Sequence, residues 1–192
     1  MKKFYTAFLL LLFLAGKGFS QSSGAAPAQA KYFGVKAGAN LSNFTGDAEG
    51  TSTQAGFHGG LYALYMESQH FGIQPEVYYS AQGAAIENGH LRLHYVTVPI
   101  MLKVFPAPAF SVQAGPYAAL LLSSKVETDS YPAQYNGNGQ DFGLAYGLSF
   151  GNESKFTVSA RHQIGLFNLN DEEGKIKNQV FQVSLGLCIS RK

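Results

Sequence analysis

The sequence predicts an all-β fold, namely an eight-stranded antiparallel up-and-down transmembrane β-barrel. Apolar side chains recur at every second position in eight segments, as expected when successive strand residues face opposite ways. The connections between these segments alternate between short and long. Only 14% of the residues are charged, against about 25% in ordinary soluble domains. The chain has 192 residues, which favours a single domain.

The first 20 residues have the layout of a secretory signal. Lys2 and Lys3 precede an apolar stretch at residues 4–15, and small residues flank a cleavage site at Ser20/Gln21. A transmembrane helix needs about 20 apolar residues, so this stretch is too short to span a membrane. We therefore expect a signal peptide at residues 1–20.

The mature chain divides into a small polar lead-in at residues 21–30 and a barrel domain at residues 31–192. Removal of the signal would leave 11 basic residues against 12 acidic ones. Such a balance argues against a nucleic-acid partner.

Each of the eight segments has one apolar face. In chain order these faces begin with Phe33, Val35 and Ala37 (residues 33–42); Ala55, Phe57 and Gly59 (55–66); Phe71, Ile73 and Pro75 (71–80); Val96, Val98 and Ile100 (91–105); Phe110, Val112 and Ala114 (110–122); Phe142, Leu144 and Tyr146 (141–150); Phe156, Val158 and Ala160 (156–166); and Phe181, Val183 and Leu185 (181–190). Leu91 and Leu93 have the opposite phase to Val96, which predicts a bulge near His94. About 9 to 11 residues are enough for a tilted strand to cross a membrane.

The connections define two different rims. Short turns are expected at residues 68–69, 106–109 and 151–154, and long polar loops at 43–53, 83–90, 124–139 and 168–177. Outer-membrane barrels have short periplasmic turns and long extracellular loops. Near the short-turn rim, the apolar faces carry a candidate aromatic girdle of Phe33, Tyr65, Phe71, Phe110, Phe150 and Phe156. A second girdle is expected from Phe57, Tyr79, Phe142 and Phe181.

The charged residues within the strands decide which face points inward. All of them lie on the polar faces, and we expect them to form an ion-pair network in the lumen: Lys36, Glu76, Lys103, Asp141 and Arg161. A soluble lipocalin-like barrel that binds a small hydrophobic ligand is the alternative, and a periplasmic sandwich is a third possibility. A water-exposed exterior would carry far more charge than five residues. An eight-stranded lumen is filled by its own side chains, so a diffusion pore is not expected.

Several stretches resemble a known family in order and spacing. They are FGVKAGANL at residues 33–41, FGIQPEVYYS at 71–80, VPIMLK at 98–103, VQAGPYAALL at 112–121 and DFGLAYGL at 141–148. Together they are similar to the PorT-like outer-membrane β-barrel proteins of Bacteroidetes. The resemblance implies a multi-pass protein of a Gram-negative outer membrane, with lipid and lipopolysaccharide around it. One type of member assists a protein-secretion system, so outer-membrane or secretion-system proteins are possible partners.

No catalytic or metal site is expected. The candidate catalytic groups are histidines acting as bases beside Ser80, Ser123 or Asp47. The sequence spacing places no histidine beside a nucleophile, and no serine lies in a nucleophile motif. The candidate histidines are His58, His90, His94 and His162. The acidic residues 171–173 and the pair Glu127 and Asp129 lack the spacing of a calcium loop, and Cys188 is the only cysteine. We therefore expect no enzyme activity and no cofactor.

Overall fold

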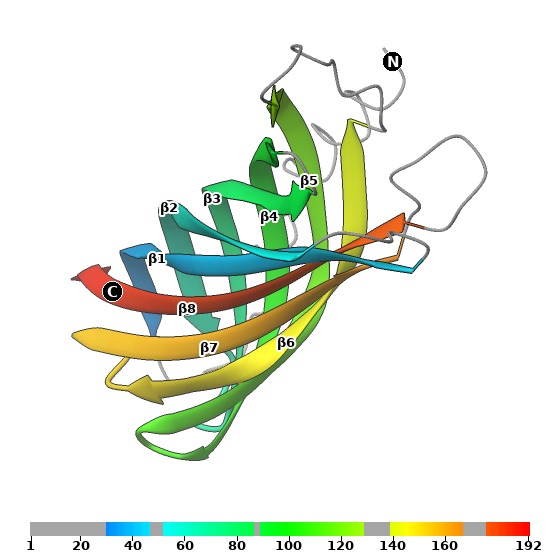
Figure 1. The fold of residues 1–192 in the computed structure, drawn as a ribbon. Coiled ribbons are helices and arrows are strands. Elements are labelled where there is room, and N and C mark those ends of the chain that lie inside the picture. Colours follow the sequence, from blue (N-terminus) through cyan, green and yellow to red (C-terminus); the bar gives the residue numbers. More distant parts are fainter. Residues whose placement is uncertain (1–29, 47–51, 87–88, 129–138, 167–175) are drawn as a thin grey trace, which may run out of the picture.

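The computed structural model describes residues 30–46, 52–86, 89–128, 139–166 and 176–192, and these form eight strands. The strands are β1 (Lys31–Gly46), β2 (Ser52–Met66), β3 (Phe71–Ile86), β4 (Gly89–Ala107), β5 (Phe110–Thr128), β6 (Gln140–Gly151), β7 (Phe156–Gly165) and β8 (Ile176–Arg191). Each strand pairs antiparallel with the next, and the sheet closes on itself (Figure 1). The predicted eight-stranded up-and-down barrel is confirmed. Among the described residues, no helix is long and apolar enough to cross a membrane.

Pairing between the first and last strands closes the barrel. β1 and β8 pair from Tyr32 opposite Arg191 to Gly46 opposite Ile176, with one register shift between Phe33 and Gly34. At the short-turn end, the Lys31 N–H donates to the Lys192 carbonyl at 2.9 Å, and the Lys192 N–H donates to the Lys31 carbonyl at the same distance. Closure removes both sheet edges, which a bilayer requires because its core cannot hydrogen-bond to free backbone groups.

The short-turn rim is as the sequence predicts. β2 joins β3 through residues 67–70, β4 joins β5 through 108–109, and β6 joins β7 through 152–155. In the last of these turns, the Asn152 side-chain oxygen accepts from the Ser154 N–H at 2.9 Å and from its hydroxyl at 2.6 Å. An Asn side chain that accepts two residues ahead replaces a backbone turn bond.

The apolar face of every strand points outward. Phe150, Phe156 and Leu144 expose 57%, 56% and 50% of their surface, whereas Lys103 and Arg161 are buried in the lumen. A soluble lipocalin-like barrel would have the opposite arrangement. The exterior therefore suits lipid, and the alternative of a soluble barrel with a small hydrophobic ligand is not supported.

Two predicted details are wrong at the long-loop rim. Residues 83–90 are not a loop, because β3 continues to Ile86 and β4 already begins at Gly89. A bulge does lie at the level of His94, but its extra residue is on β5 rather than on β4: His94 pairs with Ser123 and Tyr95 with Leu121, which leaves Leu122 as the extra residue. β4 alternates without interruption, so Leu91 and Leu93 face the lumen with Tyr95.

These inward apolar residues lie in the lumen toward the long-loop rim. Leu91, Leu93 and Tyr95 pack in one cluster with Phe44 of β1 and Ala84 of β3. The phase of Leu91 and Leu93 was attributed to a bulge, so their place in this cluster was missed.

Some predictions fall outside the described residues. They concern the signal peptide at 1–20, nearly all of the lead-in at 21–30, Asp47, Asp129 and the acidic residues 171–173. The side chain of Glu127 is likewise not described.

Candidate functional site in the lumen and on the lipid-facing wall

Glu76 is the centre of the charged lumen cluster. Arg161 on β7 donates to both of its carboxylate oxygens, at 2.9 and 2.6 Å, in a two-pronged pair. Lys36 on β1 donates to the same oxygens at 3.4 and 3.5 Å. β3 and β7 lie on opposite walls, so this pair spans the barrel. Because the side chains are buried, each charge depends on its partner for stabilisation.

Neutral amides extend the cluster. Gln74 donates to Glu76 at 2.7 Å and accepts from Lys103 at 3.3 Å, so it links the lysine to the carboxylate. Gln113 accepts from Arg161 at 2.8 Å. The cavity beside these side chains measures about 10 Å³, which is room for about one water molecule. The lumen at this level is therefore filled.

The carboxylate that pairs with Lys103 was missed in the sequence. Glu153 lies in the turn between β6 and β7 and accepts from Lys103 at 2.5 Å. The prediction counted only charges on strands. The sequence offered a signal for it, because Glu153 is an acidic residue in a short turn, and a turn side chain can fold back over a narrow lumen.

Asp141 does not belong to this cluster, and the prediction of one network of five charges is wrong at this residue. Its carboxylate accepts from Tyr117 at 3.0 Å and from Asn178 at 3.1 Å. On β6, Asp141 lies six residues before Gly147, the partner of Arg161. Six residues span roughly 20 Å of strand, which is beyond the reach of a salt bridge.

His58 lies in a third buried polar group. Its Nδ1 contacts the Asn40 side-chain oxygen at 2.7 Å, and its Nε2 contacts the Ser184 hydroxyl at 2.8 Å. This is the atom order of a hydrolase triad. All three side chains are buried, however, so a substrate could not reach Ser184 in the closed barrel. We interpret the group as lumen packing.

Glycines make room for the lumen aromatics. A Cβ at Gly34 would lie 2.6 Å from the ring of Tyr62, its cross-strand partner. A Cβ at Gly143 would lie 2.6 Å from the ring of Tyr117, also its cross-strand partner. Any larger residue would therefore collide with the ring.

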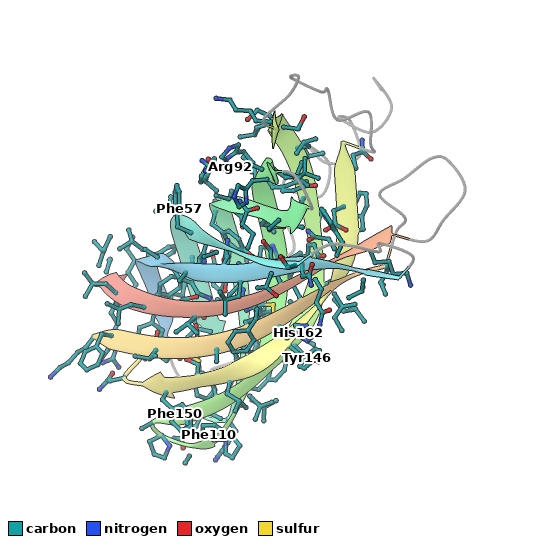
Figure 2. All side chains as sticks on the ribbon, viewed as in Figure 1. Phe57, Arg92, Phe110, Tyr146, Phe150 and His162 are labelled. Carbon is teal, nitrogen blue, oxygen red and sulfur yellow. The ribbon has the colours of Figure 1, made fainter. Side chains whose placement is uncertain are left out.

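The candidate periplasmic girdle lies on the outer wall. Phe33 contacts Tyr65 with ring centroids 6.2 Å apart, and Phe110 contacts Phe150 at 4.8 Å, as Figure 2 illustrates for the second pair. Phe156 is exposed, and Phe71 is partly exposed. These outward positions at the short-turn rim are those an interfacial belt requires.

Two polar groups interrupt the apolar exterior. The hydroxyl of Tyr146 lies 2.8 Å from His162 Nδ1, and Gln179 Nε2 lies 2.7 Å from His162 Nε2. We call these three residues the outer triad; Tyr146 and His162 are neighbours in Figure 2. On another wall, Tyr79 contacts His94 Nδ1 at 2.5 Å.

The remaining catalytic and metal candidates are not assembled into a site. Ser80 binds Asn40 rather than a histidine, and His90 is exposed on β4. Within the ranges that the structure describes, no three His, Cys, Asp or Glu residues are grouped so that they could hold a metal ion.

Comparisons with known proteins agree with this architecture. The outer membrane protein beta-barrel domain family matches residues 19–171. None of the curated proteins compared with the chain matches it.

Two solved barrels share the fold at low sequence identity. Neisserial surface protein A is 12% identical with a TM-score of 0.61, and the alignment covers 82% of this chain and 97% of that one. Ail, the attachment invasion locus protein of Yersinia pestis, is 15% identical with a TM-score of 0.53, and the alignment covers 85% of this chain and 99% of that one. The chain therefore belongs to the outer membrane protein beta-barrel domain family and is an outer-membrane β-barrel protein.

Proposed function

We propose that this barrel is a closed, non-enzymatic outer-membrane protein with a structural or interaction role, whose extracellular loops meet partners. The observation that carries this proposal is the filled lumen. Arg161, Glu76 and Gln113 bridge the interior, and the cavity beside them has room for about one water molecule. The apolar cluster around Leu93 occupies part of the lumen toward the long-loop rim. A barrel filled at two levels is suited to holding its exterior and loops in place rather than to transport.

Electrical recording tests the closed lumen. The mature protein, refolded into planar bilayers, is expected to give no steady ionic conductance, with a large porin as the positive control. The variant E76A is expected to stay closed as well, because the apolar cluster lies at a different level. Steady conductance from the unaltered protein would overturn the proposal.

We also propose that the chain reaches the outer membrane after cleavage near Ser20/Gln21, and that it is a PorT-like member of its family. The signal layout and the family resemblance support this. Mass measurement of the purified protein should give an N-terminus at Gln21, and the protein should fractionate with outer membranes. Recovery of an uncleaved chain would contradict the first part.

Lipopolysaccharide, outer-membrane lipid and secretion-system proteins are the partner classes that this proposal names. Affinity purification from native outer membranes is expected to recover a defined outer-membrane or secretion-system protein. Recovery of the barrel alone, under conditions that preserve other outer-membrane complexes, would argue for a purely structural role.

A further inference from the structure

The outer triad lies within the apolar band rather than at its edge. His162 is six residues beyond Phe156 of the girdle on β7. At about 3.3 Å per residue and a tilt of about 40°, six residues rise roughly 15 Å into a band about 25 Å tall. On the same outward face, Val158 precedes His162, and Leu166, 52% exposed, follows it. The polar atoms of the triad are therefore surrounded by apolar wall.

The hydrogen bonds within the triad leave groups unused. Because the Gln179 amide donates to His162 Nε2, the imidazole proton is on Nδ1 and is donated to the Tyr146 oxygen. The Tyr146 hydroxyl proton and the Gln179 side-chain oxygen then have no partner within the triad. Tyr146 is 50% exposed on the outer wall. Acyl chains offer no hydrogen bond at this depth, so lipid does not satisfy either group.

A second copy of the chain offers both missing partners. A two-fold axis along the membrane normal preserves depth, so the triad of one copy meets the triad of the other at the same level. The same rotation brings β8 of one copy opposite β6 of the other, because the triad is centred on β7, between them. The Tyr146 hydroxyl can then donate to Gln179 of the second copy, and the reverse bond forms by symmetry. Ala160, a small residue next to His162 on the outer face, permits close approach.

We propose that the outer faces of β6, β7 and β8 form a two-fold interface between two copies of this barrel, with the outer triad at its centre. This inference goes beyond the proposed function, since it names the barrel wall rather than the loops as a contact surface. A monomer with a closed lumen would refute this inference and leave the proposed function intact.

Self-association in bilayers is the first test. The mature protein carrying C188S and a fluorophore on S68C, in the turn between β2 and β3, is diluted with lipid and followed by energy transfer. We expect a reversible dimer, and we expect Y146F to weaken it about tenfold, since two symmetry-related bonds are lost at about threefold each. Y79F is the matched control, because it removes a hydroxyl from the other outward tyrosine–histidine pair. No energy transfer above random proximity, or equal dimerisation by Y146F, would overturn the proposal.

Cross-linking locates the surface. In the C188S background, A160C is expected to form covalent dimers with a short bismaleimide. A37C and A114C are matched controls, since each lies four residues beyond a girdle phenylalanine on β1 or β5 and is exposed. All variants should keep heat-modifiable migration, which shows that the barrel is folded. Dimers from A114C or A37C in preference to A160C would place the contact elsewhere and refute the assignment.

Discussion

Replacement of Glu76 by alanine should destabilise the barrel more than replacement of Arg161. The change E76A leaves Arg161 and Lys36 together in the lumen with no carboxylate between them. Removing one partner of a buried pair lowers the free energy of unfolding by about 3 to 5 kcal/mol. Because E76A removes a two-pronged pair, we expect a loss of about 4 kcal/mol. The change R161A leaves Glu76 paired with Lys36 at 3.4 Å, so we expect it to lower the free energy of unfolding by only about 3 kcal/mol.

A double-mutant cycle measures the interaction itself. The double variant should recover about 2 to 3 kcal/mol of the summed single losses, because Arg161 is then no longer buried without the Glu76 carboxylate. Urea unfolding of the refolded protein is followed by circular dichroism, since the chain contains no tryptophan for fluorescence. D141N combined with R161A is the control and should be additive, because Asp141 bonds to Tyr117 and Asn178 instead.

The cycle has a clear negative result. Losses of E76A and R161A that add to within about 0.5 kcal/mol would show that the two side chains do not interact in the folded barrel. Coupling of Asp141 to Arg161 would equally refute the separation of the two polar groups.

The remaining predictions concern the wall, a glycine and the periplasmic rim. L144R should reduce folded yield in bilayers, because Leu144 is exposed on the outer wall six residues from the girdle residue Phe150, and a cation near the midplane costs about 2 to 4 kcal/mol; normal yield would mean that this face does not contact lipid. G143A should lower the free energy of unfolding by about 1 to 3 kcal/mol, because the added Cβ would lie 2.1 Å from the Ile164 carbonyl oxygen and 2.6 Å from the Tyr117 ring, whereas G59A, whose nearest neighbour would be 3.8 Å away, should be tolerated. E153Q and K103M should both loosen the turn after β6, because the two side chains form one ion pair. The expected result is faster proteolysis at that turn in each variant, and an unchanged rate in both would contradict this role of the pair.

Periodicity was sufficient to predict the strands and their faces. Because strand side chains alternate strictly, Phe150 and Val158 could be assigned to the exterior and Arg161 to the interior from the sequence alone. The ends of the strands could not be predicted in this way. Residues 83–86 are rich in small side chains and suggest a loop, yet pairing with β4 extends β3 through them.

The grouping of the lumen charges depended on information that periodicity lacks. Alternation indicates which face of a strand a residue occupies. Its height along the barrel axis, and so which residues of other strands it meets, depends on the stagger of the strands around the barrel. Glu76 and Arg161 share a level, whereas Asp141 does not, and nothing in the local sequence distinguishes them. Glu153 was missed for a related reason, since a turn residue has no assigned face.

The pairing of β1 with β8 has a consequence for how the molecule is made. The two strands that complete the cylinder are the first and the last of the eight along the chain, so the contacts that close it join residues more than a hundred positions apart. Folds dominated by such distant contacts form slowly. Until β8 pairs with β1, the folding sheet has two open edges that can pair with other chains. A premature stop before residue 176 should therefore yield an aggregating species rather than a smaller barrel.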